Sequence, residues 1–402
     1  MKLSPVNQKR WKRFHQNKRA FICLIIFSIL TIISMGSEIV FNDKALMVKY
    51  KGDYYFPIVQ DQIPAKTFGL EGDSEANYLT LQNQFNNSDN FVVMPLVPFS
   101  ADTIDKIDTQ ELDKKINLID QSYNKKANQI KTEKSDSATI KTLLFELNIE
   151  KNLKKGALEE LKYHPLPPNL EQQHYLGTDS NGRDIFSRLS YGYRIAIGFA
   201  LILLVINYSI GVSIGCLMGY VGGWFDLIVQ RIIEVLSNVP FLYVIIIIAA
   251  IIREKGGTMG FWSLVGIYAF FGWMGMTWYM RTTTFKEKSR EYILAARANG
   301  ASNSRIIFSH ILPNVMSLLV TFIPFSISGS IVGLTSLDYL GYGLPKGTPS
   351  WGELIKLGIE LIHAPWIITS VVCIMSIVLF LINSVGEGVR DAFDPKQVST
   401  YE

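Results

Sequence analysis

Charge is scarce in this sequence. Only 18% of its 402 residues are Asp, Glu, Lys or Arg, and six stretches contain none of them: 20–37, 195–221, 235–252, 256–280, 309–337 and 363–386. A helix needs about 20 mostly apolar residues to cross the hydrocarbon of a bilayer, and a buried helix of a soluble protein would carry a polar stripe instead. The sequence therefore predicts an all-α integral membrane protein with six transmembrane helices and excludes a soluble enzyme.

Reactive motifs are also missing. The chain has no phosphate-binding loop, no H-E-x-x-H, no C-x-x-C and no G-x-S-x-G, and its five histidines are scattered. Cys23, Cys216 and Cys373 lie in the apolar stretches without metal-ligand spacing. The sequence thus predicts no catalytic residue, no metal ligand and no bound cofactor. A net charge of +4 spread over tails and loops gives no footprint for nucleic acid.

The basic residues indicate an orientation. Seven of them precede the first apolar stretch with no acid among them: Lys2, Lys9, Arg10, Lys12, Arg13, Lys18 and Arg19. The positive-inside rule places this end in the cytoplasm, and six crossings then place both termini there. A signal peptide is the alternative, but Ser34-Met35-Gly36 is a poor cleavage site, which favours an uncleaved anchor.

Three regions follow from this topology. Residues 1–37 form a basic tail and the first span, and 38–173 form a periplasmic insert with short strands over 41–100 and a helical hairpin over 104–162. Residues 174–402 hold the other spans, at about 195–221, 235–252, 257–280, 311–337 and 364–386, with a cytoplasmic loop over 281–314. The insert is either a contact surface for an external partner or a variable decoration.

Small residues repeat within two spans. Gly211, Gly215 and Gly219 recur every four residues, and Gly329 and Gly333 repeat the spacing later. Glycines at this interval line one helical face and allow another backbone to approach closely. The pattern indicates a tightly packed translocation bundle or ordinary packing of membrane helices.

The loop over 281–314 contains a more specific pattern. "REYILAARA" consists of strong helix formers, Gly300 suits the residue that ends a helix, and Ser302-Asn303-Ser304 offers an N-cap. "RIIFSHIL" then starts a second helix that runs into Pro313. We expect a helix–turn–helix with Arg297 and Arg305 exposed around the turn, serving either as a docking element or as a connector on the membrane surface.

Several motifs resemble one family. "AARANG", followed nine residues later by "HILP", is similar to the EAA loop of permease subunits in bacterial ABC importers. "HYLGTDSNGRDIFSRLSYGYRIAIGFAL", "GYVGGWFD" and "LDYLGYGLPKGTPSWGELI" resemble the C-type permease of oligopeptide and dipeptide importers. The upstream "FNDKALMVKYKGDYYFPIV" resembles the Yej-type branch, which is associated with peptides and microcins.

The resemblance implies a MetI-like ABC importer permease fold in the bacterial inner membrane. It implies peptide uptake with a second permease as heterodimer partner, two ATPase subunits or a fused pair that use ATP and magnesium, and a periplasmic or lipid-anchored binding protein, all in contact with membrane lipid. Carried over by position, the ATPase-coupling residues are Glu291, Ala295, Ala296, Arg297, Gly300, Arg305 and Pro313.

One position departs from the family pattern. The acid of the EAA motif falls at position 294, where this chain has Leu294, and Glu291 lies one helical turn earlier. Coupling is therefore expected to depend on packing more than on a salt bridge. Two other functions stay open: a membrane sensor, disfavoured by the short tail after Gly386, and an ATP-independent carrier, disfavoured by charge-free spans. No substrate-binding residue is predicted.

Overall fold

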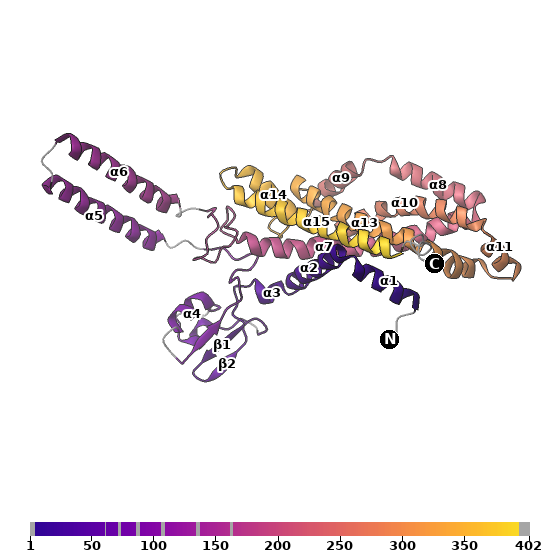
Figure 1. The fold of residues 1–402 in the computed structure, drawn as a ribbon, viewed down its shortest axis with the longest axis horizontal. Helices are drawn as coiled ribbons and strands as arrows, with labels where there is room; N and C mark the ends of the chain where they lie inside the picture. Colours follow the sequence, from indigo (N-terminus) through magenta and orange to yellow (C-terminus); the bar gives the residue numbers. More distant parts are fainter. Residues whose placement is uncertain are drawn as a thin grey trace. The chain divides into compact units, whose positions relative to one another are not determined.

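The computed structural model describes residues 5–60, 62–70, 74–85, 89–105, 109–133, 137–160 and 164–393 (Figure 1). The chain divides into two compact units. The first comprises residues 1–37, 189–360 and 368–402, and the second comprises 38–188 and 361–367. Residues 394–402, which belong to the predicted cytoplasmic end, lie outside the described part of the chain.

The first unit is helical. Long apolar runs form long helices, one of which contains an internal proline, Pro324, and close contacts between them involve small residues. Its elements are α1 Pro5–Gln16, α2 Lys18–Met35, α7 Ile185–Val221 from residue 189 on, α8 Gly223–Ser237, α9 Phe241–Glu254, α10 Phe261–Lys288, α11 Glu291–Ala298, α12 Asn303–Arg305, the π-helix η2 Ile306–Ile311, α13 Leu312–Leu340, α14 Trp351–Glu360 and α15 Pro365–Phe393 from residue 368 on.

Four described helical segments are long and apolar enough to cross a membrane: Lys18–Met35, Ile185–Val221, Asn303–Leu340 and Pro365–Phe393. The pair α8 and α9 qualifies as a fifth if it is counted as one bent span. The predicted spans at 20–37, 195–221, 311–337 and 364–386 fall on the four long segments, each displaced or extended at its ends. Six spans remain a prediction.

The helix is interrupted within the predicted span at 235–252. The chain breaks between α8 and α9, whose axes are bent by 71°. Pro240 causes the break, because it lacks an N–H and disfavours helical backbone in the residue before it. At 1.5 Å per residue, α9 alone extends for only about 21 Å, less than the roughly 30 Å of hydrocarbon.

The second helix of the 281–314 loop does not stop at Pro313 as expected. Helical structure continues from Asn303 through η2 and α13 to Leu340. In η2 the turn is wider than in an α-helix, and the Leu312 N–H donates to the Ile307 carbonyl five residues earlier. Pro313 has no N–H that would need a hydrogen-bond partner in the turn that follows. The helix therefore continues through Pro313.

The glycines of α7 lie against α10. A Cβ at Gly211 would come within 2.8 Å of the Trp273 carbonyl, and one at Gly215 within 2.6 Å of the Thr277 carbonyl. Gly219 meets the Arg281 carbonyl in the same way, at 2.5 Å. The glycine at every fourth residue thus lets the backbones of α7 and α10 approach more closely than a residue with a side chain would permit.

The two glycines of α13, Gly329 and Gly333, differ in how closely they are packed. A Cβ at Gly333 would lie 2.9 Å from the Tyr268 hydroxyl, so this position is closely packed. At Gly329 a Cβ would meet nothing within 4 Å. Gly329 therefore makes no close contact of this kind with the described residues of this chain, and it borders a cavity described below.

The second unit contains a small antiparallel sheet. Its strands are β1 Met47–Tyr50, β2 Asp53–Tyr55 and β3 Phe91–Val93, in the order β2-β1-β3, with Lys49 opposite both Tyr54 and Phe91. The 3-10 helix η1 Ala65–Phe68 and α4 Tyr78–Phe85 cover one face. Buried Val48, Phe68 and Leu81 form the core between them. The short strands expected over 41–100 are present.

A helical hairpin follows the sheet. It consists of α5 Thr109–Glu133 and α6 Ser137–Glu160, which run side by side (Figure 1). Asp120 accepts a hydrogen bond of 3.0 Å from Lys155, and Tyr123 donates one of 2.7 Å to Glu150. The hairpin expected over 104–162 therefore forms within these bounds. On α6, Phe145, Ile149 and Leu153 are exposed at four-residue intervals.

Candidate functional site

The predicted coupling segment has the expected helix, turn and helix. Helix α11 ends in two hydrogen bonds that run back across the turn: the Ala301 N–H donates to the Ala296 carbonyl, and the Gly300 N–H donates to the Arg297 carbonyl. Gly300 has φ +75°, the left-handed conformation that this type of helix end requires. The Ser302 hydroxyl then caps the next helix by accepting from the Arg305 N–H.

A buried cluster holds the segment in place. Ile293 of α11 and Ile306, Ile307 and Ile311 of η2 are almost fully buried, together with Met280 of α10. Because these residues come from both sides of the turn and from α10, the turn cannot shift without exposing aliphatic surface. The segment is therefore part of the first unit's packed interior on one side only.

The other side of α11 is open. Glu291, Leu294, Ala295 and Ala298 are exposed at spacings of three and four residues, which places them on one helical face. Leu294 exposes 52% of its surface, the largest apolar side chain on this face. The face is mostly small and apolar with a single acid, so it offers shape rather than charge to a partner.

The predicted coupling residues do not all lie together. Ala296 is half-buried and packs against the isoleucine cluster, whereas Ala295 faces outward. Arg297 donates a hydrogen bond of 3.3 Å to the Tyr220 hydroxyl. Arg305 and Pro313 are exposed beyond the turn. Arg297 and Arg305 are both exposed, as expected, and Arg297 is in addition hydrogen-bonded within the unit.

Asp226 and Arg281 form an ion pair near the predicted coupling segment, and no sequence pattern assigned a role to either residue. Asp226 of α8 accepts two hydrogen bonds, of 2.5 and 2.6 Å, from Arg281 of α10. Such a bidentate pair is strong and directional. It ties α8 to α10, the helix that leads into the predicted coupling segment.

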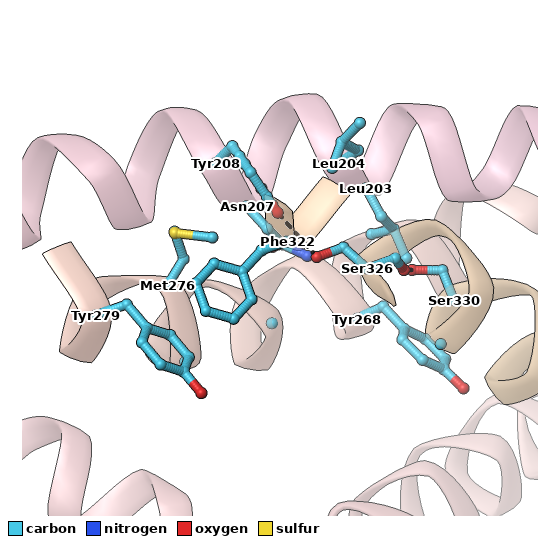
Figure 2. A pocket seen from close by; sticks show the side chains of 13 residues that line it. Leu203, Leu204, Asn207, Tyr208, Tyr268, Met276, Tyr279, Phe322, Ser326 and Ser330 are labelled. Atoms are coloured by element: carbon cyan, nitrogen blue, oxygen red, sulfur yellow. Dashed lines mark hydrogen bonds between the residues drawn. The ribbon is translucent and has the colours of Figure 1, made fainter. Parts of the chain in front are cut away.

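An uncharged cavity of about 350 Å³ lies between α7, α10 and α13 (Figure 2). Within the part of the chain that the structure describes, its walls carry hydroxyl and amide groups but no Asp, Glu, Lys, Arg or His side chain. No sequence pattern marked it, because its residues are spread over 203–330. They are Leu203, Leu204, Asn207, Tyr208, Tyr268, Gly272, Gly275, Met276, Tyr279, Phe322, Ser326, Gly329 and Ser330.

Comparison with known proteins assigns the chain to a family. Residues 211–399 match the family described as Binding-protein-dependent transport system inner membrane component. The chain is 35% identical to the peptidoglycan transport system permease protein YejE of Agrobacterium fabrum, covering 98% of this chain and 94% of that protein. The chain belongs to this family of transport permeases. It is 36% identical to the inner membrane ABC transporter permease protein YejE of Escherichia coli, covering 98% of this chain and 99% of that protein.

A more distant relative covers only part of the permease. The oligopeptide transport system permease protein OppC of Haemophilus influenzae is 33% identical over 57% of this chain and 72% of that protein. The predicted resemblance to C-type and Yej-type permeases is confirmed. The permease fold, the helical membrane character and the role as a transport subunit are confirmed as well. The permease is thus a multi-pass inner-membrane protein.

Proposed function

We propose that this permease forms half of the pathway through which a bacterial ABC importer takes up peptides or peptide-like compounds, peptidoglycan fragments included. The observation that carries this proposal is its similarity, over 98% of the chain, to a permease named for peptidoglycan transport. The partial similarity to a permease named for oligopeptides points to the same chemistry of linked amino acids. The other half of the pathway is a second, different permease.

The exposed face of α11 is the proposed ATPase contact. It is defined by Glu291, Leu294, Ala295 and Ala298, and it ends at the Gly300 turn. The buried isoleucines behind this face pack the segment tightly against its neighbours. A displacement of α11 by the ATPase would therefore also displace α10 and α13. ATP and magnesium are used by the partner ATPase, and alternating access follows from rigid-body tilting of the helices.

Six spans are proposed, with α10 as the additional one. At 1.5 Å per residue its 28 residues extend for about 42 Å, enough to cross a bilayer. Its apolar character comes from Trp, Tyr, Phe and Gly more than from aliphatic residues, and residues 261–280 contain no charge. With both termini in the cytoplasm, the segment after α10 is cytoplasmic and the 38–173 insert is periplasmic, where it is accessible to a binding protein.

The test is reconstitution of the whole transporter. The permease is co-expressed with the second permease, the ATPase subunits and the binding protein from the same genome, and the purified complex is placed in proteoliposomes. We expect uptake of a labelled short peptide that requires ATP and the binding protein. Uptake that proceeds without ATP would instead support the carrier, and peptide binding without uptake would support the sensor.

A further inference from the structure

Helix α1 directly precedes a helix that is long and apolar enough to cross a membrane. It ends at Gln16, and that helix, α2, begins at Lys18. Asn17 between them has a non-helical backbone, and its side chain caps α2 by accepting a hydrogen bond of 3.2 Å from the Ala20 N–H. Figure 1 shows the two helices meeting in a bend. Because the 18 residues of α2 are only just enough to cross the hydrocarbon, α1 lies at the surface of the bilayer.

Helix α1 is also held against the end of α15. Phe14 is buried together with Ala20 of α2 and Ala392 of α15. The guanidinium group of Arg10 lies over the ring of Phe393, 4.2 Å from its centroid. These contacts join α1 to the ends of two membrane-span candidates, so α1 has a fixed position in the first unit.

Trp11 is the exposed aromatic residue of α1. Its ring stacks on Phe14, with ring centroids 5.9 Å apart, yet 53% of its surface remains exposed. Tryptophan is enriched where the hydrocarbon of a bilayer meets water, because its ring is apolar and its N–H is polar. A basic helix with an exposed Trp at the start of a span is typical of a helix that lies in the membrane interface.

The charge of α1 and of the first turn of α2 has one sign. Residues 5–37 contain no Asp or Glu, and their six basic residues are Lys9, Arg10, Lys12, Arg13, Lys18 and Arg19. In the part of the chain that the structure describes, no ion pair involves Lys9, Lys12 or Arg13. A helix is about 10–12 Å across, close to the distance of about 8 Å over which salt screens charge. Basic side chains on several faces of α1 therefore act together on an anionic surface.

We infer that α1 lies flat on the membrane and binds the headgroups of anionic phospholipids. Trp11 lies among the upper parts of the acyl chains, and Lys9, Lys12 and Arg13 attract the headgroups. An acidic protein surface would match the charge but would not account for an exposed Trp beside the start of a span. Because α1 is held against α15, the lipid contact also positions the end of α15. This role goes beyond the proposed transport function and does not depend on it.

The first experiment measures which lipid gathers at α1. The full-length permease, co-purified with its partner subunits, carries no native cysteine and has His15→Cys labelled with bimane, one turn after Trp11 on an exposed position. The complex is placed in phosphatidylcholine nanodiscs that contain a small fraction of phosphatidylglycerol or phosphatidylcholine with a nitroxide on the acyl chain near the headgroup. We expect phosphatidylglycerol to quench at least about threefold more strongly, and high salt to reduce this preference. Equal quenching by the two lipids at low salt would overturn the inference.

A charge variant and a matched control locate the preference. The charge variant carries Lys9→Gln, Lys12→Gln and Arg13→Gln, and its quenching ratio should fall close to one. The control carries the same number of changes at exposed lysines of α5 and should keep the ratio of the unsubstituted complex: Lys114→Gln, Lys125→Gln and Lys131→Gln. Co-purification of the partner subunits should be unchanged in both. An unchanged ratio in the charge variant would overturn the lipid contact, and loss of the ATPase with that ratio unchanged would assign the basic residues to the ATPase instead.

A third variant tests the position of Trp11. Trp11→Ser should lower quenching by both lipids at least about twofold, because α1 loses the side chain that holds it at the level of the acyl chains. Trp11→Phe should retain most of the quenching. If Trp11→Ser quenched as strongly as the unsubstituted complex, α1 would not be held in the interface by this residue, and the flat orientation would be contradicted.

Discussion

At the residue scale, His174 is the most constrained ionisable group of the second unit. It is fully buried and stacks on Phe99, with ring centroids 4.0 Å apart. Its Nδ1 lies 2.9 Å from the buried carboxylate of Asp184, and its Nε2 lies 3.5 Å from Asp105. Burial opposes the charged form, but the bonding and charge of Asp105 and Asp184 outweigh it and raise the pKa of His174 to about 9.

This arrangement predicts a pH-dependent stability. Because the folded pKa of His174 exceeds the unfolded value of about 6.5, the charged imidazole stabilises the fold fully below that pH and loses its contribution as pH rises through about 9. We expect the free energy of unfolding to fall by up to about 3 kcal/mol between pH 6.5 and 10. Proteolysis of the second unit in detergent, measured against pH, tests this.

His174→Gln is the control for the pH effect. Removal of the ring should lower stability at neutral pH and abolish the part of the pH dependence that the imidazole supplies, leaving only the titration of surface groups. An identical pH profile in His174→Gln and the unsubstituted protein would contradict the role of this histidine.

The glycine face of α7 gives a second prediction at this scale. Gly215→Leu should destabilise the first unit by about 1–3 kcal/mol, because its Cβ would lie 2.6 Å from the Thr277 carbonyl, which belongs to backbone that cannot move aside. Gly198→Leu on the same helix meets nothing within 4 Å and is the control. Thermal unfolding in detergent measures both, and equal transition temperatures would show that α7 and α10 do not need this close approach.

At the element scale, the Gly300 turn decides how α11 is presented. A side chain at Gly300 would meet nothing within 4 Å, so the requirement is conformational and arises from φ +75°. Gly300→Val should distort the turn at a cost of roughly 1–2 kcal/mol and separate ATP hydrolysis from uptake, while membrane insertion persists. Gly300→Asn should retain coupling, because Asn tolerates this backbone region.

The measurement is the number of peptides taken up per ATP hydrolysed in the reconstituted complex. If Gly300→Val and Gly300→Asn had the same ratio as the unsubstituted transporter, the turn would not be needed for coupling. A loss in both variants would indicate that glycine itself is required at the contact.

The exposed face of α11 also distinguishes shape from charge. Leu294 is half exposed and occupies the position of the family's acid, while Glu291 supplies the only carboxylate of the face. We expect Leu294→Ala to weaken retention of the ATPase about five- to tenfold, in the range of a buried apolar anchor. Glu291→Gln should change it less than about twofold. A larger loss in Glu291→Gln would show that the contact depends on charge.

At the scale of the whole molecule, the orientation of the permease can be read from labelling. In a variant without Cys23, Cys216 and Cys373, single cysteines are placed at the exposed positions Asn124 on α5 and Ser304 on α12. A membrane-impermeant maleimide added outside spheroplasts should label Asn124→Cys at once and Ser304→Cys only after lysis. The reverse order would invert the topology, and labelling of both from outside would contradict an odd number of crossings between them.

Local patterns predicted much of this permease. The charge-free runs indicated where long helices lie, the strong helix formers before Gly300 indicated α11, and the Lys- and Leu-rich stretch indicated the hairpin of α5 and α6. These features depend on a few consecutive residues, whose hydropathy and backbone preferences act before any tertiary contact forms. The same reasoning misjudged Pro240, which splits a predicted span, and Pro313, which a π-turn accommodates.

By itself, the sequence determined that this chain is a helical membrane permease with an exposed helix–turn–helix around Gly300, because hydropathy, glycine conformation and family motifs depend on adjacent residues. Only the tertiary structure decided that Gly329 borders a cavity, that Arg281 is hydrogen-bonded to Asp226, and that the side chain of Asn207 packs against Gly272. These relations join residues from helices far apart in the chain. Which side chains meet depends on how the helices rotate and pack against one another, and no local pattern specifies that.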